Sequence, residues 1–181
     1  VFYSKLEPKA QFNNMESVKK EVELMFDPSA DPYAAPAEPQ GEPERFGAKD
    51  VTDLSWKQLM DAYSCTECGR CTQQCPASQT GKLLSPRKIM MDTRDRLEEV
   101  GKNIDKNGKD QPDGKSLWGD YIQEEELWAC TTCNACVEAC PVMINPLSII
   151  MDMRRSLVME ESKVPSELAG MVTNIENNGA P

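Results

Sequence analysis

The sequence predicts an all-α fold built from two pseudo-repeated units, each pairing a cysteine loop with a helix. Three observations support this fold class. Strand-like alternation of apolar and polar residues is scarce. One stretch occurs twice, at 85–97 and again at 145–157. The 8 cysteines also fall into two copies of one spacing. A chain with two such copies is expected to fold into two similar halves.

Each copy of the repeated stretch begins like a helix. Ser85 and Asn145 are suited to cap a helix N-terminus, and each is followed by proline, which fits the first helical position because its missing N–H costs nothing there. Apolar residues then recur at helical spacing, at Ile89, Met90 and Leu97 and at Ile149, Ile150 and Leu157. We expect the methionines of these faces to pack in the core rather than to bind metal.

Helical patterns also precede each cysteine loop. Residues 52–63 offer Thr52 as a cap and a run of apolar side chains, and 124–128 leads into the second loop in the same way. Residues 101–120 are rich in Gly, Asn, Asp and Lys and are expected to form an exposed connector between the halves.

The cysteines form the pattern Cys-x2-Cys-x2-Cys-x3-Cys-Pro twice, which is typical of a chain that binds two 4Fe-4S clusters. Three thiolates of a motif reach one cubane, and the fourth, turned away by the proline, reaches the other. The ligand sets expected from this crossed pairing are Cys65, Cys68, Cys71 and Cys140 for cluster 1 and Cys130, Cys133, Cys136 and Cys75 for cluster 2.

Two other uses of cysteine fit the sequence less well. Zinc prefers two separated pairs of ligands, which this run of cysteines fits poorly. Disulfides need an oxidising compartment and a geometry that closely spaced cysteines meet badly, and no secretory signal opens the chain. The iron-sulfur interpretation therefore leads, and it implies a reducing setting.

The composition of the chain excludes several classes of function. With 30 acidic and 20 basic residues the formal charge is −10, so nucleic acid is not expected as a partner. Histidine is absent, which removes imidazole-based catalysis and Rieske or haem ligation by this chain. No phosphate-binding or dinucleotide-binding motif occurs either. We expect an electron-transfer subunit or domain with no substrate catalysis of its own.

Outside the two motifs the chain divides into three segments. Residues 1–26 contain a short amphipathic helix with Met15, Val18, Val22 and Met25 on one face, and 27–50 form an acidic, proline-rich linker. The dicluster domain is assigned to 51–162, followed by a C-terminal helix and tail at 163–181. The chain contains no apolar run long enough to span a bilayer and does not begin with Met, so further sequence is expected upstream.

The two cysteine motifs, with the helix and gap between them, resemble the α-helical ferredoxin domain. That domain occurs in the C subunit of heterodisulfide reductase and is similar to the C-terminal half of the succinate dehydrogenase iron-sulfur subunit. The chain as a whole resembles the cytoplasmic part of a Bacteroidetes-type, membrane-anchored member of the heterodisulfide-reductase-related proteins. The resemblance implies an α-helical ferredoxin preceded by an extended proline-rich segment.

The same resemblance implies a role and a location. Single electrons would pass through two 4Fe-4S clusters in a membrane-associated respiratory oxidoreductase, at the cytoplasmic face of the inner membrane. Redox partner proteins would include a haem-b-type membrane domain upstream and a Cys-Cys-Gly-type catalytic subunit, because this chain has no adjacent cysteines. Any membrane contact would come through a segment outside this chain. Two alternatives stay open, a catalytic oxidoreductase subunit and a structural metal-binding interaction module.

Overall fold

The computed structural model describes residues 19, 22–23, 26, 45–108 and 111–180, and in this part of the chain every regular element is helical. The only β-pairing there is an isolated bridge between Trp118 and Ile122. This confirms the all-α prediction. Of the predicted N-terminal helix only residues 19, 22–23 and 26 are described, and these are helical, while most of the predicted proline-rich linker lies outside the described residues.

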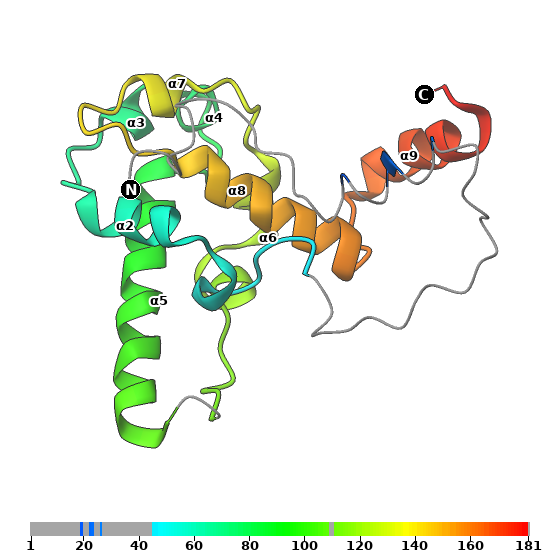
Figure 1. The fold of residues 1–181 in the computed structure, drawn as a ribbon. Coiled ribbons are helices and arrows are strands. Elements are labelled where there is room, and N and C mark those ends of the chain that lie inside the picture. The colour runs from blue at the N-terminus through cyan, green and yellow to red at the C-terminus, as the bar shows by residue number, and fades with distance from the viewer. Residues whose placement is uncertain (1–18, 20–21, 24–25, 27–44, 109–110, 181) are drawn as a thin grey trace.

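Two helices form the framework of the domain, as Figure 1 shows. The long helix α5 (Pro86–Asn107) and the shorter α8 (Pro146–Arg155) pack against each other. The Ser85 side chain accepts a hydrogen bond from the backbone N–H of Lys88, and that of Asn145 accepts one from Ser148. Both predicted caps are therefore confirmed, each with proline in the first turn.

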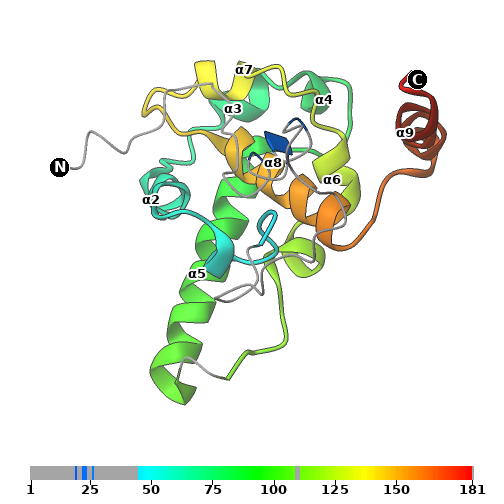
Figure 2. The same ribbon diagram turned by 45° about the vertical axis from the view of Figure 1, so that its right-hand side comes forward.

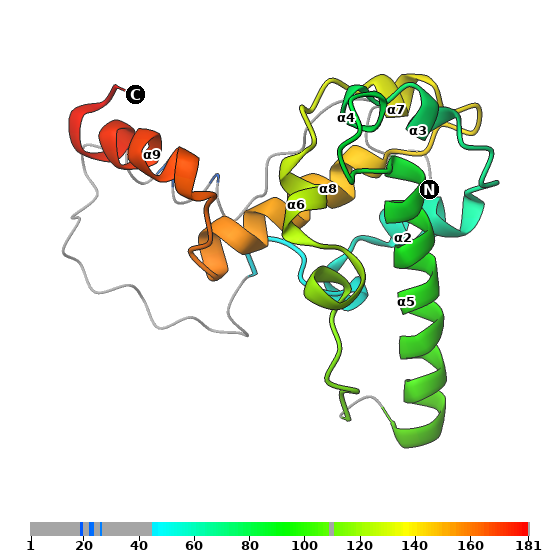
Figure 3. The same ribbon diagram turned by 180° about the vertical axis from the view of Figure 1, so that it is seen from behind.

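The remaining elements lie around this pair. In chain order they are η2 (Val51–Asp53), α2 (Trp56–Ser64), α3 (Arg70–Gln73), α4 (Pro76–Gln79), η3 (Leu117–Tyr121), α6 (Glu124–Trp128), α7 (Ala135–Glu138), η4 (Ser156–Glu160) and α9 (Ser166–Asn178). Helix α2 contacts both α5 and α8. Seen from behind, α6 lies across α8 (Figure 3), and the two helices are in contact.

The core lies where α5 and α8 meet. Ile89 and Met90 of α5 and Ile149, Ile150 and Met153 of α8 are all nearly or fully buried. Burial of such side chains contributes roughly 1.5–3 kcal/mol each relative to exposure. Met90 and Met153 therefore pack in the core, as the helical spacing predicts.

The predicted start of the helix before the first cysteine loop was wrong. Residues 51–53 form a short 3-10 turn, and α2 begins only after Ser55. The Ser55 hydroxyl accepts a hydrogen bond from the backbone N–H of Gln58, and the Gln58 side chain accepts one from the backbone N–H of Ser55. This reciprocal capping box stabilises the later start.

The predicted exposed connector at 101–120 is also only partly exposed. Helix α5 continues to Asn107, and Leu117 is fully buried. Buried Arg96 donates hydrogen bonds to both oxygens of Asp113 and to the carbonyl of Lys115, which ties this segment to the helix.

Residues 45–50 pack on the same body. The backbone N–H of Ala48 donates to the carbonyl of Asp152 in α8, and Asp50 accepts hydrogen bonds from Arg96. The packed region therefore includes chain upstream of Val51.

The C-terminal helix α9 stands apart from the domain, joined to it by an extended segment (Figure 2). None of its residues is buried, and it ends at Gly179 in a left-handed conformation, as its Asn-Asn-Gly sequence predicts. Among the described residues, no helix combines the length and apolar character needed to cross a bilayer.

Candidate metal centre

The two cysteine motifs lie side by side at one end of the molecule, because their short helices α3 and α7 are in contact (Figure 1). Each motif loop turns twice through left-handed backbone, at Glu67 and Gly69 in the first and at Thr132 and Asn134 in the second. The φ values agree closely, 57° at Glu67 and 56° at Thr132. The two halves therefore share one loop conformation.

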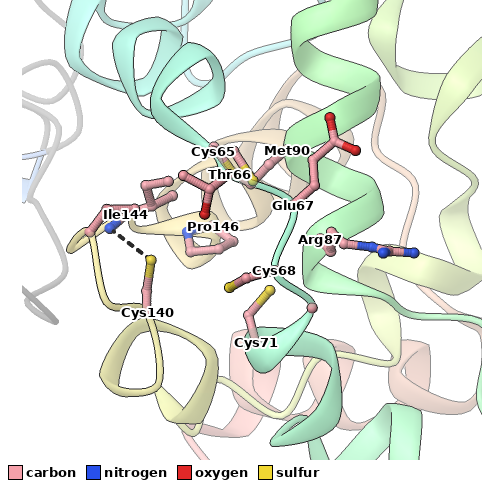
Figure 4. A pocket seen from close by; sticks show the side chains of 12 residues that line it. Cys65, Thr66, Glu67, Cys68, Cys71, Arg87, Met90, Cys140, Ile144 and Pro146 are labelled. Carbon is pink, nitrogen blue, oxygen red and sulfur yellow. Dashed lines mark hydrogen bonds between the residues drawn. The ribbon is translucent and has the colours of Figure 1, made fainter.

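The structure brings Cys140 of the second motif together with three cysteines of the first. Cys65, Cys68, Cys71 and Cys140 line one cavity, together with apolar side chains that include Met90 and Ile144. Figure 4 shows their sulfur atoms facing a common space. The Ile144 backbone N–H donates to Cys140 Sγ over 3.4 Å, which orients this sulfur.

The other four cysteines also come from both motifs. Cys136 and Cys75 are buried, Cys130 is partly buried and Cys133 is exposed. The backbone N–H of Thr132 donates to Cys130 Sγ over 3.4 Å. Cys136 packs with Val137 and Leu147 in a small apolar cluster. This second set is more deeply enclosed than the first.

Burial raises the pKa of three of these thiols, Cys71, Cys130 and Cys136. Burial raises the pKa of Cys136 to about 12, and the neighbouring sulfurs of Cys130, Cys75 and Cys71 contribute in the same direction. Burial also raises the pKa of Cys71, with added effects from Cys65 and Cys140. Thiolates here need a positively charged core to stabilise them, since thiolate is the form that binds metal.

The arrangement of donors fits a multi-iron core better than a single ion. All 8 cysteines are free in the structure. Within the described part of the chain, no three Cys, Asp or Glu side chains are grouped tightly enough to hold one metal ion. A zinc ion needs four sulfurs about 2.3 Å from one centre, whereas a cubane spreads four thiolates around a larger core.

Two arginines that the sequence analysis did not single out lie beside the loops. Arg94 of α5 donates to Glu67 Oε1 at 2.6 Å, in the first loop. Arg154 of α8 donates to the carbonyl oxygens of Leu127 and Cys130, at the start of the second. The repeat itself carries the signal that could have found them, since the two arginines occupy equivalent positions in 85–97 and 145–157.

Arg154 is held against an aromatic ring. Its guanidinium lies 5.0 Å from the centroid of Trp128, and its pKa is lowered by burial. The indole N–H of Trp128 is buried without a hydrogen-bond partner among the described residues. A buried donor two residues before Cys130 is compatible with a neighbouring sulfide acceptor.

Comparison with protein families identifies the class of this domain. Residues 64–144 match the model of the 4Fe-4S dicluster domain. That range contains all 8 cysteines. The matched segment is therefore a dicluster 4Fe-4S domain, and its cofactors are two 4Fe-4S clusters.

Two of the curated relatives that the chain matches are named as oxidoreductases. The chain is 35% identical to the probable iron-sulfur-binding oxidoreductase FadF of Bacillus subtilis, over 94% of this chain and 26% of that protein. It is 35% identical to the EtfAB:quinone oxidoreductase of Syntrophomonas wolfei, over 77% of this chain and 22% of that protein. The chain thus spans about a quarter of the length of these two relatives.

A third relative matches the predicted resemblance. The chain is 32% identical to the C subunit of the ferredoxin/F(420)H(2)-dependent CoB-CoM heterodisulfide reductase of Methanosarcina acetivorans, over 65% of this chain and 60% of that protein. The chain therefore carries a 4Fe-4S dicluster domain and is related to the C subunits of heterodisulfide reductases and to EtfAB:quinone oxidoreductase.

Proposed function

We propose that the two clusters are held by crossed sets of cysteines. Cluster 1 is bound by Cys65, Cys68, Cys71 and Cys140, and cluster 2 by Cys130, Cys133, Cys136 and Cys75. The observation that carries this proposal is the single cavity lined by the first four, three from one motif and one from the other. The contact between α3 and α7 supports it, because it brings the motifs within reach of each other.

The protein's own residues hold, enclose and tune these centres. When bound, the clusters supply reversible one-electron transfer without proton transfer. Backbone N–H groups of Thr132 and Ile144 donate to ligand sulfurs, which favours the thiolate form. Apolar side chains such as Met90 and Val137 limit the access of water. Each of the eight iron positions has a thiolate of its own in this assignment, so no iron is left free for substrate.

We further propose that the chain is the electron-relay part of a larger, membrane-associated oxidoreductase. Relatives are named a probable membrane-anchored ferredoxin in Chromohalobacter salexigens and an EtfAB:quinone oxidoreductase in Syntrophomonas wolfei. Their names support an electron path between a protein donor and the membrane. A haem-b-type membrane domain, a Cys-Cys-Gly-type catalytic subunit and a site at the cytoplasmic face of the inner membrane complete the proposal.

The test is anaerobic purification followed by metal analysis and a redox titration. We expect about eight irons and eight sulfides per chain, no stoichiometric zinc, and two one-electron transitions. Zinc in place of iron, or clusters that do not change oxidation state, would contradict an electron relay. A signal from a three-iron or solvent-ligated centre would instead favour a catalytic subunit.

A further inference from the structure

The repeat places an arginine at the same position in each half of the domain, and the two arginines have different interaction partners. Arg94 on α5 and Arg154 on α8 occupy equivalent positions of the repeat. Both side chains reach the cysteine loop of their own half. The partner of Arg94 there is charged and the partners of Arg154 are not, although the two cysteine loops share one backbone conformation.

The charge of Arg94 is neutralised. Its Nη2 lies 2.6 Å from Glu67 Oε1, and its Nε lies 3.6 Å from Asp95 Oδ1. Glu67 lies between Cys65 and Cys68, so the carboxylate and the guanidinium are placed together beside the first loop. An ion pair of this kind contributes little net charge to its surroundings.

The charge of Arg154 has no such partner. The repeat places Thr132 where the first loop has Glu67, and Arg155 where α5 has Asp95. Arg154 instead donates to the carbonyl oxygens of Leu127, at 3.0 and 2.5 Å, and of Cys130, at 2.6 Å. In the part of the chain that the structure describes, no carboxylate lies within ion-pair distance of it.

We propose that Arg154 sets the reduction potential of cluster 2 by placing an unneutralised positive charge beside Cys130, while Glu67 cancels the equivalent effect of Arg94 on cluster 1. The inference rests on the ligand assignment proposed above. Reduction adds one electron and no proton, so the cluster gains one negative charge. A fixed positive charge stabilises that reduced form and raises the potential.

Burial makes this charge more important at the second site. Cys75 and Cys136 are both buried, and an enclosed, poorly hydrated site disfavours added negative charge. Arg154 opposes that effect from a partly buried position, where solvent screening is weaker than at the surface. Its position over the Trp128 ring and its carbonyl contacts fix the charge in place.

The shared backbone permits an exchange of the two loop residues. Glu67 and Thr132 have φ values of 57° and 56°, so each site already accepts the conformation that the other residue adopts. Thr132→Glu would give Arg154 the carboxylate partner that Arg94 has. Glu67→Thr would remove that partner from Arg94. Both variants retain the two arginines.

The test is a redox titration of the full chain, loaded with both clusters under anaerobic conditions and followed by electron paramagnetic resonance. Thr132→Glu should lower one midpoint potential, with a change on the order of tenfold in the equilibrium constant, equivalent to ~59 mV for one electron. Glu67→Thr should raise the other midpoint. Arg154→Gln should lower the same midpoint as Thr132→Glu.

The matched control is the double variant Glu67→Gln/Arg94→Gln, which removes both charges of the first-loop pair and should leave both midpoints near those of the unmodified chain. The proposal is wrong if Thr132→Glu leaves both midpoints unchanged, raises one, or moves the midpoint that Glu67→Thr moves. If Arg154→Gln fails to bind cluster 2, Thr132→Glu decides the matter, since that variant retains the Arg154 side chain.

The outcomes also separate this inference from the proposed function. A loss of iron or of redox activity in the unmodified chain would overturn the electron relay itself. If the chain shows two normal one-electron transitions but none of the three single substitutions changes a midpoint potential, only the role of Arg154 would be overturned.

Discussion

Arg96 Nη2 lies 2.7 Å from Asp50 Oδ2, and this ion pair joins α5 to the segment that precedes the first 3-10 turn. The arginine side chain is 2% exposed, and it also binds Asp113 and the carbonyl of Lys115. The pKa of Asp113 is lowered to about 2, chiefly by its hydrogen bond to Arg96. One buried cation therefore holds three segments of the chain together.

Removal of this cation should destabilise the fold. Arg96→Met leaves Asp50 and Asp113 without their partner, and breaking a buried charge pair costs about 3–5 kcal/mol. Because both carboxylates retain some contact with water, at 18% and 24% exposure, we expect the lower end, near ~3 kcal/mol. Chemical denaturation under anaerobic conditions measures the change.

The control for Arg96 lies on the same helix. Lys102 pairs with Glu98 at 3.6 Å, with side chains 71% and 47% exposed. Lys102→Met should change the free energy of unfolding by less than about 0.5 kcal/mol. Equal effects of the two substitutions would show that the Arg96 contacts do not stabilise the fold.

A second prediction concerns Gly47, which lies against the backbone where α8 meets η4. A Cβ atom at this position would stand 2.3 Å from the backbone nitrogen of Ser156 and 2.4 Å from the carbonyl oxygen of Asp152. Backbone atoms cannot move aside as a side chain tip can, so Gly47→Ala should lower the free energy of unfolding by about 1–3 kcal/mol. Thermal unfolding of the loaded protein is a suitable measurement.

Gly101 offers the opposite expectation for the same chemical change. It lies inside α5, and nothing stands within 4 Å of a Cβ atom built there. Gly101→Ala should therefore raise the free energy of unfolding by up to about 1 kcal/mol, because alanine favours the helix. If Gly47→Ala were equally harmless, the close approach of residues 46–48 to α8 would be in doubt.

The fold could be predicted where local signals were strong. Ser85 and Asn145 mark the starts of their helices as caps followed by proline. The helix predicted at 124–128, before the second cysteine loop, also has the observed bounds. The start of α2 was misplaced at Thr52 because threonine and serine are both good caps. The capping box formed by Ser55 and Gln58, which is also visible in the sequence, is what favours a helix start at Trp56.

The connector at 101–120 could not be predicted in the same way, because its order depends on contacts with distant residues. Arg96 is the equivalent of Ser156 in the repeat, so nothing in the pattern marks it as buried. Its partners, Asp50 and Asp113, are far from it along the chain. Composition alone made the segment look solvated.

The thiol positions of the site could be predicted from spacing, because ligands within a short loop are held close by the chain itself. The charges around them could not. The repeat matches Arg94 with Arg154 and suggests equal roles, whereas their partners Glu67 and Leu127 belong to other segments. The difference between the halves becomes visible only when helix and loop are seen together.

A third prediction tests the crossed pairing of cysteines. Cys140→Ala should affect the same cluster as Cys68→Ala, although the two residues belong to different motifs, because Cys140 and Cys68 line one cavity. Cys75→Ala should match Cys133→Ala in the same way. Electron paramagnetic resonance of the four variants would show two pairs of matching spectra.

Uncrossed ligand sets would give a different pattern of spectra. If Cys140→Ala matched Cys133→Ala, each motif would hold its own cluster. Iron analysis supplies the control, since a variant that loses both clusters has unfolded or failed to load and gives a value near zero for iron. A variant that loses one cluster keeps about half of the iron.

The last prediction concerns Arg70, the arginine nearest to the cysteines in the sequence. Proximity to Cys71 suggests that it raises the potential of cluster 1, but its side chain is exposed, and it lines a different hollow from the four thiols. Water and salt screen an exposed charge strongly. We therefore expect Arg70→Gln to move neither midpoint by more than about 20 mV, a factor of roughly two in the equilibrium constant. A larger shift that shrinks at high ionic strength would show that surface charge also tunes the centre, and a redox titration at low and high salt distinguishes the two results.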